Sequence, residues 1–507
     1  MKTFKKSGKA FLLLSVIVVV FSHLSFAQDQ FRLSDYKNPD YRWQKLDLGF
    51  ALGGNNNYYK QEIERGITEK KNSDRINGGL DIDYYATKNS EFYQGYQDFI
   101  LYGDVLSSHN NNMDVTNDLE DDQKSNQQNI ILLARTVNRF YDKSKRFAEI
   151  DLNFDGRLNH SLHKYSADQE YLPYVNKRTD FEYTLSASIP LLIGKGRIEE
   201  VQDARLAVYI LDDLRKSGDL KRAPTSEETL ALARFITQTK NQRFFDSRIR
   251  KIAEITAIDS FLTVLDLKAQ SDASYFTLLN DNWDNANGPV RSTGGRFSFG
   301  LVPGIELSLD ESKNYYRDTL NNPEIIESYT HKSKYYTNSW GLDFVTGYVW
   351  EKPANLYWQH TVNADLSYSL FYQQMNSKIY DMDILTDELK SRLNSPNLKL
   401  RLRYAIGYYP NSRTHFRLGI NTSFNQYWGD EKISDDPEKD VGKTLVNSDL
   451  YLACYYYISP QLRFSLNINS TYLFTKKNQE LPDDIYGDEI THYMNNNIGA
   501  RLTYSIF

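Results

Sequence analysis

The feature that most constrains the fold is a period-two alternation of apolar and polar residues, which returns in segment after segment of the chain. The clearest pair of segments spans residues 398–408 and 416–424, on either side of the turn Pro410-Asn411-Ser412. Successive side chains of an extended chain point to opposite faces, so the pattern predicts strands with one apolar and one polar face. A tight turn between two such segments predicts an antiparallel pair.

Along the whole chain, the alternation predicts about fourteen strands. Short turns, such as the one around Pro353, alternate with long polar connections such as residues 107–127 and 429–443. Many of the strands run for about 12–16 residues, longer than the usual strand of a globular sheet. We expect them at about 45–55, 74–87, 92–106, 128–141, 146–158, 179–190, 291–311, 333–351, 356–373, 396–409, 413–428, 447–458, 461–475 and 492–507.

Composition excludes several classes of protein. The mean hydropathy of −0.60 excludes a polytopic helical membrane protein, which needs repeated apolar runs of about 20 residues. Sixty Lys and Arg against 66 Asp and Glu give a net charge of −6, which excludes a strongly basic nucleic-acid binder, so we expect no nucleic-acid partner. The one cysteine, Cys454, excludes a disulfide framework and a cysteine-based zinc cluster.

The first residues contain the three parts of a secretory signal. Four lysines in the first nine residues form a basic region, residues 11–20 form an apolar core, and Ser25-Phe26-Ala27 fits a small-x-small cleavage site. We therefore expect residues 1–27 to be a signal peptide and the mature chain to leave the cytoplasm.

The chain resembles the bacterial outer-membrane β-barrel in four features taken together. These are an even number of long antiparallel strands, short turns at one end, long loops at the other, and a secretory signal. The resemblance implies an all-β transmembrane antiparallel β-barrel of about 14 strands in the outer membrane, in contact with lipid and lipopolysaccharide. A soluble β-sandwich is the alternative, and strand length favours the barrel. The oligomeric state stays open. The divisions are a first barrel half of about six strands at 28–193, a helical insert at 194–282 and a second barrel half of about eight strands at 283–507.

In such a barrel the apolar face meets lipid and the polar face lines the lumen. Early strands place acids on the polar face and late strands place bases there. The acids are Asp81, Asp83, Glu149, Asp151, Asp155, Asp180 and Glu182, and the bases are Lys399, Arg401, Arg403, Arg413, Arg417, Arg463 and Arg501. Opposed walls of unlike charge select solutes by charge and resemble the constriction of general porins. This predicts a channel for passive passage of small polar or charged solutes, unless the walls meet in salt bridges that close the lumen.

One region breaks the strand pattern. We expect a helix that begins at Gly196-Arg197 and ends near Gly218, and a second helix opened by a capping box of Thr225 and Glu228. By the strand count, this α-helical insert leaves the barrel on the short-turn side, which is normally periplasmic. A third apolar stripe contains Ile249, Ile252, Ile255, Leu262 and Leu265, and other faces of that helix carry Arg248, Arg250 and Lys251.

The segment Ile189–Arg205, IPLLIGKGRIEEVQDAR, resembles the passage from strand to helix in outer-membrane efflux proteins. The resemblance implies the geometry of an exit from a barrel into periplasmic helices. An outer-membrane assembly or export component is therefore the alternative function, while helices that only pack on one another are the structural alternative. The candidates for docking a periplasmic or envelope protein are Arg197, Arg248, Arg250 and Lys251.

The sequence carries no recognisable catalytic constellation. None of the seven histidines after the signal region lies in a motif of an outer-membrane hydrolase, and the sequence has no glycine-rich phosphate loop. His160 and His163 have no clear third ligand, so we expect no metal site. The sequence therefore predicts a protein that is not an enzyme and has no cofactor.

Overall fold

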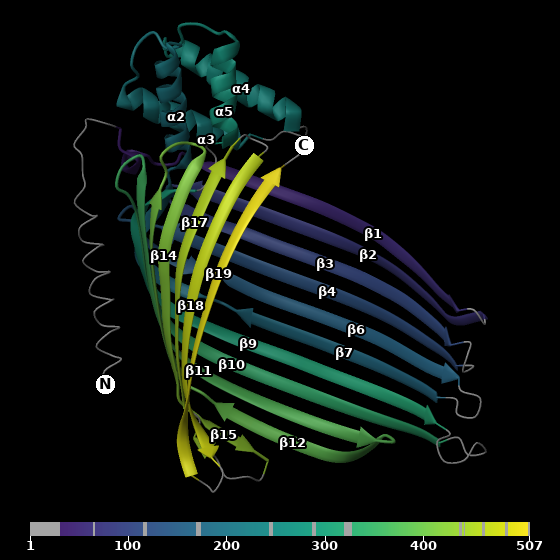
Figure 1. Cartoon of the computed structure of the whole chain (residues 1–507). Coiled ribbons are helices and arrows are strands. Elements are labelled where there is room, and N and C mark those ends of the chain that lie inside the picture. Colours follow the sequence, from purple (N-terminus) through teal and green to yellow (C-terminus); the bar gives the residue numbers. More distant parts are fainter. Residues whose placement is uncertain are drawn as a thin grey trace.

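The computed structural model describes residues 31–63, 66–114, 119–168, 174–242, 247–285, 290–318, 327–434, 439–440, 442–458, 462–481 and 485–504. The expected signal peptide, residues 1–27, lies outside the described residues. The described chain forms one long-stranded, curved β-sheet and a helical domain that stands at one end of it (Figure 1).

Within the described residues, the sheet has nineteen strands. The first eight are β1 (Tyr41–Ile63), β2 (Gly66–Ser90), β3 (Tyr93–Asp114), β4 (Leu119–Tyr141), β5 (Arg146–Ile150), β6 (Leu152–Asp168), β7 (Tyr174–Ser188) and β8 (Leu191–Glu200). After the helical domain come β9 (Ser292–Asp318), β10 (Glu327–Pro353), β11 (Trp358–Asp381), β12 (Ile384–Asn394), β13 (Asn397–Tyr408), β14 (Thr414–Tyr427), β15 (Asp430–Ile433), β16 (Lys439–Asp440), β17 (Lys443–Tyr457), β18 (Leu462–Leu481) and β19 (Ile485–Tyr504).

Several of the long antiparallel runs are interrupted. β9 pairs with β7 over residues 304–317 and with β8 over residues 292–301, so β7 and β8 are two pieces of one run. The interruption contains Pro190, which has no N–H to donate to the ladder. Pro396 separates β12 from β13 in the same way, since both strands pair with β11. When each interrupted run is counted once, the nineteen strands make fourteen antiparallel runs.

The strands extend beyond the segments in which apolar residues alternate. Most of the expected polar connection 107–127 is an extension of β3 and β4, which stay paired as far as Asp114 and Leu119. The charged segment Ile384–Asn394, which the alternation does not predict as a strand, forms β12. Both expectations were wrong because the hydrogen bonds of a ladder join backbone groups, so a polar sequence does not by itself end a strand.

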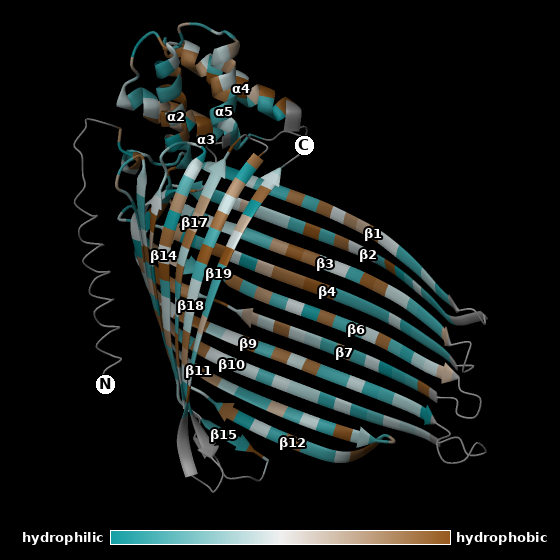
Figure 2. Cartoon of the chain, viewed as in Figure 1, coloured by the Kyte–Doolittle hydropathy of each residue, from teal (hydrophilic) through white to brown (hydrophobic). Residues whose placement is uncertain are grey.

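The sheet exposes apolar side chains along one face. Leu402 on β13 and Leu418 on β14 are 45% and 47% exposed, and apolar and polar residues alternate along most strands (Figure 2). The side chains between them, such as Arg401 and Arg417, lie on the other face, where they line a cavity. A water-soluble sheet buries its apolar face, so this sheet has the inverted arrangement of a sheet surrounded by an apolar medium.

The sheet has two edges in the described structure. Among the described residues, β1 has backbone register partners only on β2, and β19 only on β18. The ends of β1 and β19 that are remote from the helices lie well apart (Figure 1). Apolar residues on these edges are the most exposed of the sheet, with Leu48 at 70% and Ile498 at 75%.

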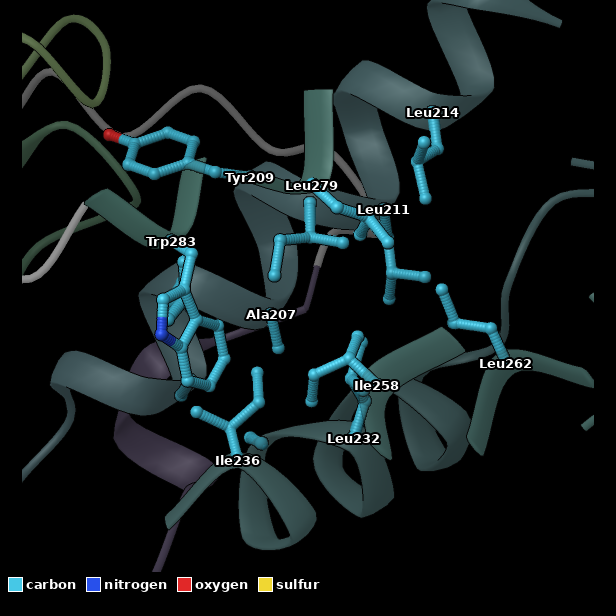
Figure 3. Packing of buried hydrophobic residues seen from close by; sticks show 14 of the residues in the cluster. Ala207, Tyr209, Leu211, Leu214, Leu232, Ile236, Ile258, Leu262, Leu279 and Trp283 are labelled. Carbon is cyan, nitrogen blue, oxygen red and sulfur yellow. The ribbon is translucent and has the colours of Figure 1, made fainter. Parts of the chain in front are cut away.

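The connection from β8 to β9 folds into the helical domain. Its helices are α2 (Gln202–Ser217), α3 (Ser226–Lys240), α4 (Ser247–Val264) and α5 (Ala273–Asn285). They pack apolar side chains against one another, and Leu232, Ile236 and Leu262 are fully buried (Figure 3). The short helix η1 (Leu33–Asp35) and Tyr36 join this core, where the Tyr36 hydroxyl lies 2.6 Å from Thr237 Oγ1. All the helices that the described residues form are too short or too polar to span a lipid bilayer.

Two expected helix boundaries are confirmed and one is wrong. α2 ends before Gly218, which has a left-handed φ of 84°, and Thr225 with Glu228 forms the capping box at the start of α3. However, α2 begins at Gln202 and not at Gly196-Arg197. Residues 191–200 instead form β8, because they complete the ladder between β5 and β9.

Candidate functional site

The acids expected on the early strands lie on the polar face, but they do not form a continuous negatively charged surface. On β2, Asp83 lies opposite Asp47 of β1, and Asp81 lies opposite Gly49. A Cβ at Gly49 would overlap the Asp81 carboxylate, so the glycine leaves the space that this carboxylate occupies. Lys45 forms an ion pair with Asp47 two residues along β1 and so offsets part of the negative charge.

Arginines neutralise other acids of this group. Arg157 Nη2 lies 2.8 Å from Asp155 Oδ2, and Arg178 Nε lies 2.9 Å from Asp180 Oδ1. Each arginine is two residues from its partner on the same strand, and therefore points to the same face. These arginines were not among the predicted site residues, although the spacing of two residues that indicates the acids also indicates them.

Glu149 and Asp151 are buried and do not line an open channel. They are 5% and 7% exposed. Glu149 forms an ion pair with Arg139 of β4, and Asp151 accepts a hydrogen bond of 2.9 Å from the Asn138 N–H at the interruption between β5 and β6. Glu182 is exposed on β7, and its register partner on β9 is Asp310.

A cavity of about 710 Å³ lies over the middle of the polar face. It is lined by residues of β3, β4, β6, β7, β9, β10 and β11. Its charged lining is one base, Arg135, and three acids, Asp155, Glu306 and Asp343. Of these four charged residues, only Asp155 was predicted from the sequence. The cavity therefore has an acidic lining.

A second cavity, of about 630 Å³, lies between β11, β13, β14 and β17. Its lining contains Lys399, Arg401 and Arg403 of β13 and Arg417 of β14, with Asp449 as its single acid. Four of the seven bases expected on the late strands are thus brought together. Within the described part of the chain, none of these four cations forms an ion pair, in contrast to Arg139, Arg157 and Arg178.

The other three expected bases lie apart from this cavity. Arg413 forms an ion pair with Asp281 of α5, so it joins the sheet to the helical domain and is not a free pore-lining charge. The Arg463 guanidinium lies 5.9 Å from the centre of the Tyr457 ring. Arg501 is exposed on the edge strand β19 and lies opposite Ser465 of β18.

A third cavity, of about 460 Å³, adjoins the basic cavity on the side of the helical domain. The two cavities share Thr361, Ala405, Arg417 and Tyr451. Rings line the third cavity, and the His415 and Tyr455 rings stack with their centres 4.5 Å apart. Its charged lining is Glu351 and Arg417, and its other rings are Tyr409 and Tyr451.

Arg291, which lies between α5 and β9, joins the start of β9 to the turn before β11, whose Leu356 packs against the helical core. It is 1% exposed and donates hydrogen bonds of 2.9 Å to the carbonyls of Asn355 in that turn and of Trp358, the first residue of β11. Burial, with a smaller contribution from Arg205, lowers the pKa of Arg291 to about 10, so it stays charged at neutral pH. Its guanidinium lies 4.9 Å from the centre of the Tyr409 ring, and the Tyr209 hydroxyl of α2 donates to the Tyr409 carbonyl at 3.3 Å.

The residues expected to dock a partner make contacts within the chain. Arg197 is an interior residue of β8 that bonds to Glu199, the carbonyls of Ser90 and Glu91, and Asn89, so its assignment to a docking surface is wrong. Arg250 pairs with Glu254, and Lys251 pairs with Asp284 of α5. The side chain of Arg248 lies outside the described residues.

The two histidines considered as metal ligands do not converge. His160 and His163 lie on β6 and not in a loop, and their separation of three residues places them on opposite faces of the strand. Within the ranges that the structure describes, no group of three His, Cys, Asp or Glu side chains is arranged to hold a metal ion.

No protein-family model matches the chain, and no curated protein matches it. Among solved structures, the translocator domain of autotransporter NalP from Neisseria meningitidis is 7% identical, covering 82% of this chain and 89% of that chain, with a TM-score of 0.18. The deltaS2 mutant of the TodX monoaromatic hydrocarbon channel is 10% identical, covering 93% and 92%, with a TM-score of 0.24. The beta domain of the Bordetella autotransporter BrkA is 9% identical, covering 92% and 100%, with a TM-score of 0.20. Similarity at these identities and TM-scores does not allow a function of these proteins to be assigned to this chain.

Proposed function

We propose that the chain forms an outer-membrane β-barrel whose polar face lines a channel for small polar or charged solutes. The observation that carries the proposal is the pair of unlike faces on one long-stranded sheet. One face exposes side chains such as Leu402, Leu418 and Phe344, and the other holds charged residues around cavities of about 710 and 630 Å³. A hydrocarbon medium outside and water inside match these two faces.

The proposal requires that β1 and β19 pair and close the sheet. Unpaired backbone N–H and C=O groups are costly in hydrocarbon, so a sheet that spans a bilayer has no open edge. With fourteen runs the first and last are antiparallel, and both edges offer 20 residues or more for pairing. Fourteen strands also enclose more space than side chains alone fill.

Cysteine pairs test this closure. Ala51 lies on the polar side of β1, and Asn495, Asn497 and Gly499 lie on the polar side of β19, so Ala51→Cys is combined with a cysteine at each of these three positions. The native thiol is removed first by Cys454→Ser. We expect one of the three pairs to form a disulfide in folded protein in lipid, because the Cα atoms must come within about 7 Å. Ala51→Cys with Ile498→Cys, on the opposite face, is the matched control. If no polar-side pair forms, closure between β1 and β19 is wrong.

Single-channel recording tests the channel itself. The mature chain, from residue 28, is refolded and inserted into a planar bilayer. We expect stable open steps whose reversal potential in a salt gradient shows charge selectivity. A folded chain that remains silent in the bilayer contradicts an open channel.

A second candidate function is docking of an envelope protein by the helical domain. The observation in its favour is that Ile249 and Ile252, one turn apart on α4, are 61% and 68% exposed while the rest of the stripe turns into the core. Ile249→Ser with Ile252→Ser would abolish co-purification of such a partner and leave conductance unchanged. Retention of the same co-purified proteins by this variant contradicts the docking function.

A further inference from the structure

We propose that the basic cavity between β11, β13, β14 and β17 is a binding site for a small soluble polyanion, with two or more phosphate or carboxylate groups. The inference rests on the proposed function in one respect, since it requires that solutes reach the polar face. It goes further by assigning a ligand class to one part of that face.

The charge of the cavity is the first argument. Its lining has four cations, Lys399, Arg401, Arg403 and Arg417, and one acid, Asp449. Three of the cations follow one another at every second position of β13, so their side chains leave the same face about 7 Å apart. Cations held at this spacing repel one another, and an anion between them removes the repulsion.

The missing ion pairs are the second argument. Elsewhere on the same face Arg157 and Arg178 lie within 3 Å of a carboxylate. Asp365 of β11 is the register partner of Arg401, and Asp449 of β17 is the register partner of Asn421, yet neither forms an ion pair with the four cations in the described chain. The fold therefore brings acids near this cavity without using them to neutralise it.

The remaining lining suits an oxyanion with polar substituents. Side-chain amides and hydroxyls surround the four cations, among them Asn363, Asn421, Ser423 and Asn447. The guanidinium groups of arginine bind phosphate and carboxylate oxygens in a bidentate manner. Side-chain amides add hydrogen-bond donors that fix the orientation of the bound anion. The adjoining cavity presents Tyr451 and Tyr455, which can cover an apolar part of the same solute.

Calorimetric titration tests the site without requiring an open channel. The probe is pyrophosphate, titrated into the folded mature chain in a non-ionic detergent and a phosphate-free buffer. We expect saturable binding that weakens as salt is raised, because partly exposed charges are screened. Glucose, a neutral solute, is the control ligand.

The matched variants test whether the affinity for pyrophosphate depends on the cations of the cavity or on the net charge of the whole polar face. Arg401→Gln with Arg403→Gln should lower the affinity for pyrophosphate at least about tenfold, because two charged hydrogen-bond donors are lost. Arg157→Gln with Arg178→Gln removes the same charge from the same face and should change the affinity less than about twofold. Both double variants are first checked for a folded, strand-rich circular-dichroism spectrum.

The outcomes distinguish the site from the channel. Saturable binding that is lost only in the Arg401/Arg403 variant supports the site, even if the chain conducts no ions. No binding by the wild-type chain overturns the site, even if the chain conducts. Equal losses in both double variants also overturn it, because they show attraction to the face as a whole.

Discussion

The helical domain and the sheet use the same apolar side chains in opposite ways. In the helical domain Leu206, Leu214 and Leu232 are fully buried, whereas on the sheet Leu402 and Leu418 are almost half exposed. The helical core is packed as in a soluble protein, while the sheet leaves its apolar side chains for a surrounding medium to cover. One chain therefore contains a domain that buries its apolar side chains and a sheet that exposes them, and Arg291 lies at the boundary between the two.

The largest expected effect comes from truncating a leucine in the helical core. Leu206→Ala should lower the free energy of unfolding of the helical domain by about 3–5 kcal/mol, because it removes transfer energy and leaves a cavity. Leu402→Ala on the exposed face should cost only about 1 kcal/mol, since lipid or detergent fills the space. Chemical denaturation followed by tryptophan fluorescence measures both variants. Equal losses would contradict the inverted arrangement of the sheet.

Arg291 tests how strongly the two regions are joined. Arg291→Gln should cost about 2–4 kcal/mol, because it leaves the carbonyls of Asn355 and Leu356 without their buried donor. We expect limited proteolysis to cut the helical domain of this variant faster while the strands stay protected. Arg215→Gln, a change to an exposed arginine of α2 paired with Asp212, is the control and should behave as wild type. Unchanged cleavage in both variants would show that Arg291 does not hold the junction.

A charged substitution on the exposed apolar face tests whether that face meets lipid or water. Leu402→Arg should destabilise the folded chain in lipid by about 2 kcal/mol, the cost of placing an arginine within the hydrocarbon region. Ser308→Arg, on the polar face of β9 between Glu306 and Asp310, should be close to neutral. Folding equilibria in lipid vesicles give both values. If Leu402→Arg is as harmless as Ser308→Arg, the apolar face does not meet lipid.

The smallest effect is expected at the start of α3. Thr225→Ala should cost about 1 kcal/mol through loss of the cap to the Glu228 N–H, which lies 3.2 Å from Thr225 Oγ1. The exposed change Thr256→Ala on α4 should cost nothing. Thermal unfolding of the helical domain in the full chain compares the two, and equal melting temperatures would argue against the capping box.

The same cap gives the helical domain a dependence on pH. The hydrogen bond from Arg222, with the backbone hydrogen bond from Thr225, lowers the pKa of Glu228 to about 2. A carboxyl group whose pKa falls on folding stabilises the fold above its ordinary pKa of 4.5, and the stabilisation is lost as the pH falls from there towards 2. Glu228→Gln should remove this part of the acid dependence, as measured by the melting temperature between pH 5 and 2. A curve identical to that of the wild type would contradict the assignment.

The sequence predicted features that depend on neighbours along the chain. The two unlike faces follow from a spacing of two residues, and the capping box follows from Thr225 and Glu228 three residues apart. The pairs Arg157–Asp155 and Arg178–Asp180 are equally local, because each arginine is two residues from its acid on the same strand, so they too are predictable from the sequence.

Features that depend on distant partners could not be read in this way. Residues 191–200 alternate too weakly to indicate a strand, and only β5 and β9, about 50 and 100 residues away, make them β8. Arg291 likewise depends on a turn about 65 residues further on. The gathering of Arg417 with the β13 cations requires the register of β13 and β14, in which Arg417 is opposite Gly407.

The position of η1 and Tyr36 in the helical core has a consequence for the connectivity of the sheet. Leu33 and Tyr36 pack with residues that follow β8, so their contact closes a loop that contains every strand from β1 to β8. β1 begins at Tyr41 and β8 ends at Glu200, so the chain enters and leaves this part of the sheet next to the same folded domain. The helical domain therefore tethers both ends of the first half of the sheet at one place.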